Sequence, residues 1–291
     1  MISASEVSKL RTQTGAGMMD CKNALEEAGG DMEKAAEILR KKGIVKAAKR
    51  ADKVAADGLV TGIVSADGKT GVLVEVNCET DFVAKSEDFK TFSQEVAKAV
   101  LDHNPADVGE LFTKTVSSGS TIEGYSGELT LKIGEKVSVR RFERFESTDG
   151  GHIALYLHGT KIGAMVEIAG GNATLANDIA MHVAATNPKY LDRTQVPADV
   201  VEKEKEIYAA QLRSQKKPEN IIENILKGKI DKFLADICLV DQQFIKNEDL
   251  TVEKLTAGSN AKILRFVRFE LGEGIEKVEV DFAEEVAAQL K

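Results

Sequence analysis

Hydrophobic residues near the start of the chain recur at the three- and four-residue spacing of helices. Ser3 and Glu6 have the spacing of a capping box, and Val7 and Leu10 then fall on one face of a first helix. This helix is expected to end near Gly15, because glycine readily adopts the left-handed conformation that closes many helices.

Two more short helices are predicted by the same pattern. Asp20 is expected to cap the second helix, which ends at Gly29-Gly30. Asp31 is expected to cap the third, which closes with the basic run 40–42 before Gly43, as the helix dipole favours. Three short helices within the first 43 residues predict a small helical bundle.

The next stretch, residues 44–57, is rich in alanine and lysine and holds almost no large apolar side chain. Because it has little to bury, it is expected to be a linker. Its basic residues are interpreted as a solvated tether and not as a nucleic-acid site, since no aromatic side chain lies among them to stack on bases.

A period of two begins at Gly58. Residues 58–77 alternate apolar and polar positions around Asp67-Gly68, which predicts a β-hairpin, and residues 151–170 repeat the pattern. Each hairpin runs into a helical pattern that finishes at an Asn-Pro pair, at Asn104-Pro105 and at Asn187-Pro188.

A strand-like segment closes each repeat, because residues 135–146 are echoed by residues 261–270. The order hairpin, helix, strand therefore occurs twice. It predicts an α+β core of two related halves, each an antiparallel sheet with helices on one face. The first half has nine more residues between its sheet and its Asn-Pro pair than the second, and these include residues 78–85.

The second half carries an insertion of its own. Two amphipathic helical patterns lie on either side of the break at 216–218, which predicts an antiparallel, coiled-coil-like helical hairpin that projects from the body. A last helix is expected near the chain end, with one apolar face formed by Phe282, Val286 and Leu290.

These patterns divide the chain into parts that alternate between helical and α+β character. The expected parts are a three-helix domain (1–43), a linker (44–57), a core N-subdomain (58–146), a core C-subdomain (147–191 and 231–271), the helical hairpin (192–230) and a C-terminal module (272–291).

The composition limits the partners. The 291 residues include 39 Lys and Arg against 47 Asp and Glu, a net charge of −8, which argues against a polyanion as the main partner. No signal-peptide pattern begins the chain and no 18 consecutive residues are apolar, so a soluble, cytoplasmic protein that binds no membrane is predicted. The 3 cysteines are widely separated and fit reduced thiols.

Motifs that carry chemistry are mostly missing. The letters GKT at 68–70 form no phosphate loop, because Ile63 stands where that loop needs glycine. The 4 histidines lack zinc-binding spacing, no Gly-x-Ser-x-Gly elbow occurs, and Gly272 and Gly274 are interpreted as a turn. His182 is expected to be a packing or interface residue. No cofactor, metal site or catalytic residue is predicted.

The most informative segment is Thr80-Asp81-Phe82-Val83. Thr80 is a good helix cap and Asp81 suits the first turn of a helix, so the simpler interpretation is a helix start whose phenylalanine packs inward. In the functional interpretation, a short helical turn between sheet and main helix presents an apolar side chain and a carboxylate to a partner.

Two segments resemble the signatures of one family. Residues 75–85, EVNCETDFVAK, and residues 10–25, LRTQTGAGMMDCKNAL, are similar to the internal and N-terminal signatures of the bacterial elongation factor Ts family. The resemblance covers the whole chain and implies an N-terminal domain of the ubiquitin-associated type, a duplicated core, a helical protrusion and a C-terminal module. Residues 117–127, rich in Ser and Gly, do not align with the family pattern.

The resemblance implies a guanine-nucleotide exchange factor for elongation factor Tu in translation elongation, a protein that acts by protein–protein interaction and not as an enzyme. Thr80, Asp81, Phe82 and Val83 match the motif that disturbs the magnesium site of the partner. A second contact is implied for the N-terminal signature, at Met18, Met19 and Asp20, and a third for residues 272–291.

The implied partner is elongation factor Tu, both GDP-bound and nucleotide-free, with no direct nucleic-acid contact. A homodimer through the helical hairpin stays open. Two rival interpretations remain: an RNA-binding translation factor that uses the basic linker and the hairpin, and an enzyme with Asp81 or Cys78 as the catalytic residue.

Overall fold

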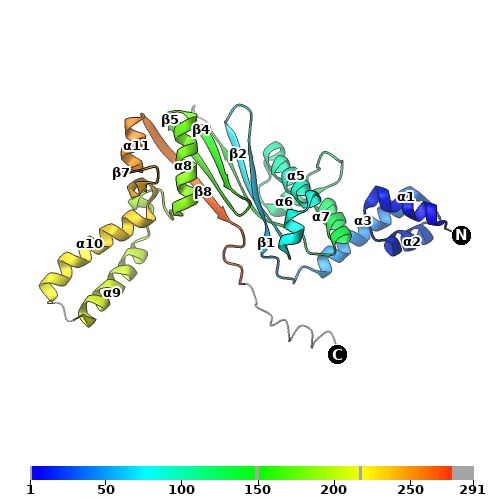
Figure 1. Ribbon diagram of the computed structural model, residues 1–291, viewed down its shortest axis with the longest axis horizontal. Helices are drawn as coiled ribbons and strands as arrows, with labels where there is room; N and C mark the ends of the chain where they lie inside the picture. The colour runs from blue at the N-terminus through cyan, green and yellow to red at the C-terminus, as the bar shows by residue number, and fades with distance from the viewer. Residues whose placement is uncertain (1, 148–150, 216–217, 277–291) are drawn as a thin grey trace. The chain divides into compact units, whose positions relative to one another are not determined.

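The computed structural model describes residues 2–147, 151–215 and 218–276. The described residues form two compact units, one built from 2–61, 74–142 and 269–276, the other from 62–73 and from the described residues of 143–268. Helices and antiparallel strands are mixed throughout, as the ribbon shows, so the predicted α+β class is confirmed (Figure 1). The last helix predicted from Phe282, Val286 and Leu290 lies outside the described residues.

Three helices form the N-terminal bundle. The first begins with the predicted capping box, in which the Ser3 N–H donates to the Glu6 carboxylate at 2.7 Å and the Glu6 N–H donates to the Ser3 hydroxyl at 3.2 Å. The helices are α1 (Ala4–Thr14), α2 (Met18–Glu27) and α3 (Met32–Lys49). Their buried core consists of Val7, Leu10, Ala16, Cys21, Ala24, Leu25, Ala35 and Leu39.

Two of the three predicted helix starts are confirmed. Asp31 caps α3, because its carboxylate accepts the N–H groups of Glu33 and Lys34 at 3.0 and 3.1 Å. The prediction that Asp20 caps the second helix is wrong. Gly17 is the N-cap of α2 without any side-chain bond, and Asp20 lies inside the first turn, where its charge suits the helix dipole.

The third helix does not close at Gly43 but continues through the predicted linker to Lys49. Helix α7 (Ile122–Ile133) crosses it there, and a Cβ on Gly43 would lie 2.7 Å from the carbonyl oxygen of Gly127. The two glycines let the helix backbones approach closely. Glycines make this close contact, so counting large apolar side chains missed it.

The first sheet has the strand order β1-β2-β3. Its hairpin turns at Asp67-Gly68 as predicted, where Gly68 has a positive φ of 70°. The strands are β1 (Asp57–Val64), β2 (Thr70–Cys78) and β3 (Ser138–Glu146), and between β2 and β3 lie α4 (Asp81–Lys85), α5 (Glu87–His103), α6 (Val108–Phe112) and α7.

The second sheet has the order β4-β5-β8. Strands β4 (His152–His158) and β5 (Ile162–Gly170) pair antiparallel, with His152 opposite Ile168 and His158 opposite Ile162. Helix α8 (Ala173–Thr186) packs on these two strands over a core that includes Val166, Ile179 and Val183, and β8 (Ala261–Glu270) completes the sheet.

The duplication predicted from the sequence is visible in the order of elements. Each half contains a hairpin, a long helix and a closing strand, and both long helices end at an asparagine in the left-handed conformation, Asn104 at φ 46° and Asn187 at φ 49°. A proline follows each asparagine and prevents the helix from continuing. The extra residues of the first half form α4, which has no counterpart between β5 and α8.

The inserted hairpin is present and longer than predicted. Helices α9 (Ala198–Ser214) and α10 (Glu219–Ile237) pack side by side, so the second helix ends seven residues later than position 230 (Figure 1). The remaining elements of this half are the 3-10 turns Arg193–Gln195 and Leu239–Asp241, β6 (Gln243–Phe244), β7 (Asn247–Thr251) and α11 (Val252–Gly258).

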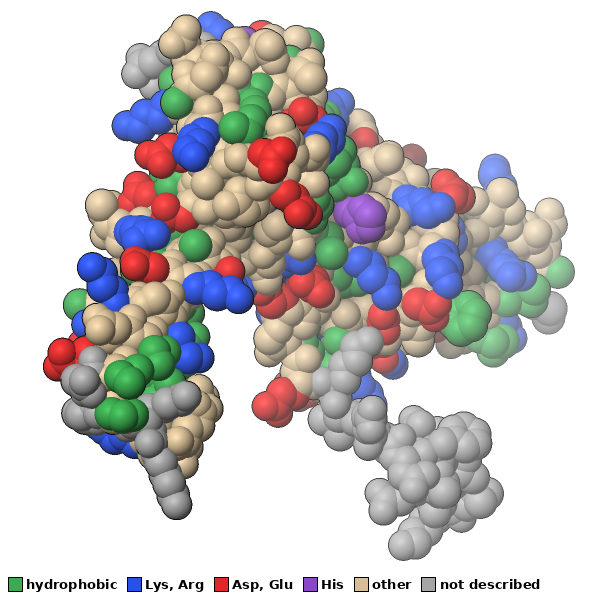
Figure 2. Space-filling model, turned by 60° about the vertical axis from the view of Figure 1, so that its left-hand side comes forward, with side chains coloured by type: hydrophobic (Ala, Val, Ile, Leu, Met, Phe, Trp, Pro, Cys, Tyr) green, Lys and Arg blue, Asp and Glu red, His purple; other side chains and the backbone are tan. Residues whose placement is uncertain are grey.

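Acidic and basic side chains are intermixed over the face seen in Figure 2, and hydrophobic side chains gather at the end of the hairpin. No helix in the described part of the chain has the length and apolar character to cross a membrane.

His182 on α8 is fully buried, which fits the predicted packing role. Its Nε2 lies 2.9 Å from the side-chain oxygen of Gln242, and its Nδ1 accepts the main-chain N–H of Ile245 at 3.2 Å. Since Nδ1 accepts, the proton lies on Nε2 and the ring is neutral. Burial lowers the pKa of His182 and outweighs the opposite effect of its bond to Gln242.

The close crossing of α3 and α7 predicts that Gly43→Ala destabilises the protein. The added methyl group would overlap the Gly127 carbonyl, and overpacking of this kind costs about 1–3 kcal/mol. Gly228→Ala in α10 is the matched control, because nothing lies within 4 Å of its Cβ position and alanine favours a helix by about 1 kcal/mol over glycine. Urea unfolding measures both, and Gly43→Ala should be less stable than Gly228→Ala by about 1–3 kcal/mol. A Gly43→Ala protein as stable as Gly228→Ala contradicts the close crossing.

The buried His182 predicts a loss of stability in mild acid. As the pH falls below the ordinary value of 6.5, the unfolded chain takes up a proton that the folded ring resists, so the free energy of unfolding decreases. His182→Gln keeps a donor and an acceptor but does not titrate. Urea unfolding at several pH values between 7.5 and 5 should therefore show a steeper decrease for wild type than for this variant, and equal slopes would rule out the contribution.

Candidate functional site

The short helix α4 presents one apolar side chain to solvent. Thr80 caps it, with the N–H of Val83 donating to the Thr80 hydroxyl at 3.5 Å. Phe82 is 81% exposed, while Val83 is buried. The simpler interpretation of this segment, in which the phenylalanine packs inward, is therefore wrong: valine supplies the inward contact and the phenyl ring is left in water.

Asp81 lies beside this ring and carries a charge. The Lys85 ammonium donates to its carboxylate at 2.6 Å, one helical turn away. That hydrogen bond is the main reason why the pKa of Asp81 lies below its ordinary value. The same ammonium lies 6.0 Å from the centre of the Phe82 ring, so Lys85 contacts both the acid and the aromatic side chain.

Two glutamates, Glu79 and Glu135, fix the residues just before α4; we call them the carboxylate clamp. Glu135 accepts the main-chain N–H of Thr80 at 3.0 Å and its hydroxyl at 2.8 Å. The Glu79 carboxylate accepts hydrogen bonds from two guanidinium nitrogens of Arg50 at 2.9 and 2.7 Å. It also accepts the main-chain N–H of Lys136 at 2.6 Å. The cap residue of α4 is thus held from a loop 55 residues further along the chain.

Cys78 is buried at the end of β2, next to this turn. Its thiol donates to the carbonyl oxygen of Thr80 at 3.1 Å. Burial raises the pKa of Cys78 to about 12, helped by the nearby charges of Glu135 and Asp57. The thiolate that a nucleophile needs is therefore scarce at neutral pH, which disfavours the enzyme interpretation based on Cys78.

A fully buried carboxylate in β2, Glu75, ties this strand to its neighbours. Arg141 and Arg140 in β3 donate to it at 2.7 and 3.0 Å, and the N–H of Gly272 donates at 2.8 Å. Burial by itself raises the pKa of Glu75, but these hydrogen bonds outweigh it and the net shift is downward. The carboxylate stays ionised because its donors replace water.

The second half repeats this ion pair in a simpler form. Glu167 in β5 is buried and accepts Arg265 of β8 at 2.6 Å. The guanidinium of Arg265 lies 4.2 Å from the ring centre of Phe145, as that of Arg141 lies 4.3 Å from Phe269. The sequence held a signal for these pairs, since a single glutamate interrupts each apolar strand and arginines recur in each closing strand.

The N-terminal candidates are on a separate element. Met18 and Met19 begin α2 with 57% and 63% of their surface exposed, and Asp20 follows them in the first turn. Methionines are unbranched and adaptable, so two of them exposed side by side suit contact with another protein.

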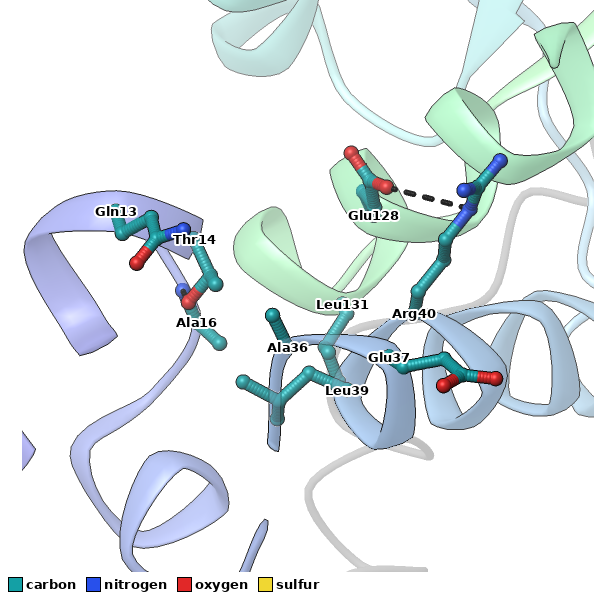
Figure 3. A pocket seen from close by; sticks show the side chains of 9 residues that line it. All are labelled: Gln13, Thr14, Ala16, Ala36, Glu37, Leu39, Arg40, Glu128 and Leu131. Carbon is teal, nitrogen blue, oxygen red and sulfur yellow. Dashed lines mark hydrogen bonds and ion pairs between the residues drawn. The ribbon is translucent and has the colours of Figure 1, made fainter. Parts of the chain in front are cut away.

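A hollow of about 380 Å³ lies between the N-terminal bundle and α7 (Figure 3). Leu39 and Leu131 form much of its apolar wall, and Arg40 faces Glu128 across it at 3.7 Å. Burial raises the pKa of Glu128 despite this arginine. Among the described residues, no group of three or more histidine, cysteine or acidic side chains could hold a metal ion.

The fold and this turn define a class: a duplicated α+β protein with an N-terminal helical bundle and an exposed phenylalanine on an additional helix. The family described as Elongation factor TS matches residues 79–273. The chain is 51% identical to the elongation factor Ts of Methylococcus capsulatus over 290 residues, which cover 100% of this chain and 99% of the relative.

Other relatives carry the same name. The elongation factor Ts of Thioalkalivibrio sulfidiphilus is 52% identical over 290 residues, and that of Alkalilimnicola ehrlichii is 49% identical over 290 residues. In both comparisons 100% of this chain and 99% of the relative are covered. This chain therefore belongs to the elongation factor Ts family of translation elongation factors.

Proposed function

We propose that this protein is a guanine-nucleotide exchange factor for elongation factor Tu, which it binds in the GDP-bound and the nucleotide-free state. The observation that carries the proposal is the exposed Phe82 beside the ionised Asp81 on an anchored turn. Family membership indicates the partner. The activity requires no bond chemistry in this chain and no cofactor, only a surface that fits the partner better once its nucleotide site is distorted.

The energy available from Phe82 matches what exchange requires. If binding of this protein weakens GDP a hundredfold, the coupling free energy is about 2.7 kcal/mol, and GDP weakens the binding of this protein by the same factor. Full burial of a phenylalanine contributes about 1.5–3 kcal/mol. Phe82 keeps 81% of its surface free in the unbound protein, so nearly all of that energy is still available for the partner.

Asp81 would act on the magnesium site of the partner by charge and hydrogen bonding. Its carboxylate is already paired with Lys85 at 2.6 Å, so exchanging this exposed pair for a contact in the partner costs little. Thr80 and Val83 support the turn, the first as its cap and the second as its buried contact.

Met18 and Met19 are proposed as a second contact with the partner, with Asp20 in the same helical turn. Residues 272–291 are proposed as a third. Homodimerisation through the helical hairpin stays a prediction, favoured by Ile207 and Ile221, which are exposed on α9 and α10.

Several basic residues of the former linker segment are already engaged within the protein, which disfavours the RNA-binding alternative. Arg50 binds the Glu79 carboxylate, and the Lys46 ammonium donates to the carbonyl of Leu131 at 3.5 Å. This chain has a net charge of −8, and a negatively charged surface repels the phosphates of RNA, so a protein partner is favoured over RNA. For a protein with a role in translation elongation we expect a cytoplasmic location and no membrane contact.

Phe82→Ala is expected to slow GDP release from elongation factor Tu at least tenfold. A tenfold change corresponds to about 1.4 kcal/mol, within the energy that burial of the ring supplies. Stopped-flow release of a fluorescent GDP, measured over a range of exchange-factor concentrations, gives the maximal rate and the half-saturating concentration.

Val45→Ala is the matched control for this variant, because it removes exposed apolar surface from α3 outside the site. Its release rate should equal that of wild type. Circular dichroism checks that Phe82→Ala is folded. If the folded variant accelerates GDP release from elongation factor Tu as much as wild type does, the proposed role of the ring is wrong.

Asp81→Ala should also lower the maximal rate of GDP release, while the affinity of the complex decreases less. The reason is that the charge acts on the ion site of the partner and adds little contact area. Calorimetric titration of the complex, compared with the release rate, separates the two quantities. An equal loss in both would show that Asp81 serves only for adhesion.

A further inference from the structure

We propose that Glu135 is a positioning residue for exchange: it holds the turn before α4 so that Phe82 meets the partner in a fixed orientation. The inference rests on the proposed function and adds to it a residue outside the signature segment 75–85. Glu135 lies in the loop between α7 and β3 and does not belong to the surface that α4 presents.

The hydrogen bonds of the carboxylate clamp are reciprocal. The Glu135 carboxylate accepts the main-chain N–H of Thr80, and the Glu79 carboxylate accepts the main-chain N–H of Lys136. Each of the two chain segments thus supplies one glutamate and one N–H to the other. This arrangement fixes both the distance and the direction of the backbone at Thr80, which neither bond alone would do.

Helix α3 extends the clamp to a third segment. Arg50, at the end of α3, binds Glu79 with two nitrogens, and both side chains are mostly buried. The Lys136 ammonium donates to the carbonyl oxygens of Ala51 and Lys53 at 2.5 and 3.0 Å. The turn that carries Phe82 is therefore joined to the end of the N-terminal bundle as well as to the α7–β3 loop.

Helix α4 needs such support because it is too short to be rigid by itself. It spans only five residues, about one turn, and isolated helices of this length are not stable in water. An exposed ring on a mobile turn would have to be ordered by the partner at the moment of binding, and that ordering subtracts from the energy left for distorting the nucleotide site.

Glu135 also supports the cap of α4 directly. The Thr80 hydroxyl donates to Glu135 at 2.8 Å and accepts the N–H of Val83 at 3.5 Å. The carboxylate thus fixes the hydroxyl with its lone pair toward the first turn of the helix. Glu135→Ala removes both bonds at once, whereas Glu135→Gln can still accept the Thr80 N–H with its amide oxygen and donate to the hydroxyl oxygen with its amide nitrogen.

The test measures fluorescent GDP release from elongation factor Tu for the full-length wild type, Phe82→Ala, Glu135→Ala, Glu135→Gln and the double variant Phe82→Ala/Glu135→Ala. Glu135→Ala should lower the maximal release rate at least fivefold with a half-saturating concentration within about twofold of wild type, because hydrogen bonds to a charged group order the turn. Glu135→Gln should retain more than half of the wild-type rate. In the double variant, Glu135→Ala should cause no loss beyond that of Phe82→Ala.

Glu95→Ala is the matched control. Glu95 also accepts a main-chain N–H and a hydroxyl, those of Ser117 at 3.0 and 2.5 Å, but it holds a different loop. Its release rate should equal that of wild type. If Glu135→Ala fails to fold by circular dichroism, Glu135→Asp replaces it, since the charge is kept but the shorter side chain cannot reach Thr80; the same decrease in maximal rate is expected.

Each outcome separates this inference from the proposed function. If wild type does not accelerate GDP release, the proposed function fails. If Phe82→Ala is slow but Glu135→Ala is as fast as wild type, the inference about Glu135 alone is overturned. It is equally overturned if Glu135→Ala costs the same factor in the Phe82→Ala background, because Glu135 would then act independently of the ring.

Discussion

The anchored backbone at the start of α4 holds the ring of Phe82 in water. Phe82 keeps 81% of its surface exposed and forgoes the roughly 1.5–3 kcal/mol that burial would supply. The constraint comes from hydrogen bonds at the start of α4, namely the Thr80 cap and the two bonds of Thr80 to Glu135, together with the inward packing of Val83. In the unbound protein, the burial free energy of the Phe82 ring is therefore still available for contact with another molecule.

The duplicated core explains where this turn is placed. Both halves use a hairpin, a long helix ending at an asparagine and a closing strand, and both bury a glutamate against arginine, Glu75 and Glu167. Only the first half inserts α4 between its hairpin and its long helix. The duplicated sheets thus form the scaffold, and the additional residues of the first half form the turn proposed to contact the partner. Many proteins carry their functional residues on loops held by such a scaffold.

The sequence predicted the elements whose signals are local and missed what depends on distant packing. Capping by Ser3 and Asp31 and the two hairpins follow from neighbours a few residues apart, and these were confirmed. Past its predicted end, α3 lies against a glycine of α7 that is distant in sequence, and the bond between Thr80 and Glu135 spans 55 residues. The Thr80 cap was predicted, but the outward direction of Phe82 was not. Phenylalanine and valine are both commonly buried, so the sequence does not indicate which of the two packs against the core.

We propose that the surface around Phe82 fits elongation factor Tu better when the nucleotide is absent. The most direct measurement is the dissociation constant of the complex with elongation factor Tu, determined by calorimetry without nucleotide and again at saturating GDP and Mg²⁺. Since coupling is reciprocal, the constant should increase at least a hundredfold with GDP. Equal constants in the two conditions would contradict the account, because binding would then have no means of releasing GDP.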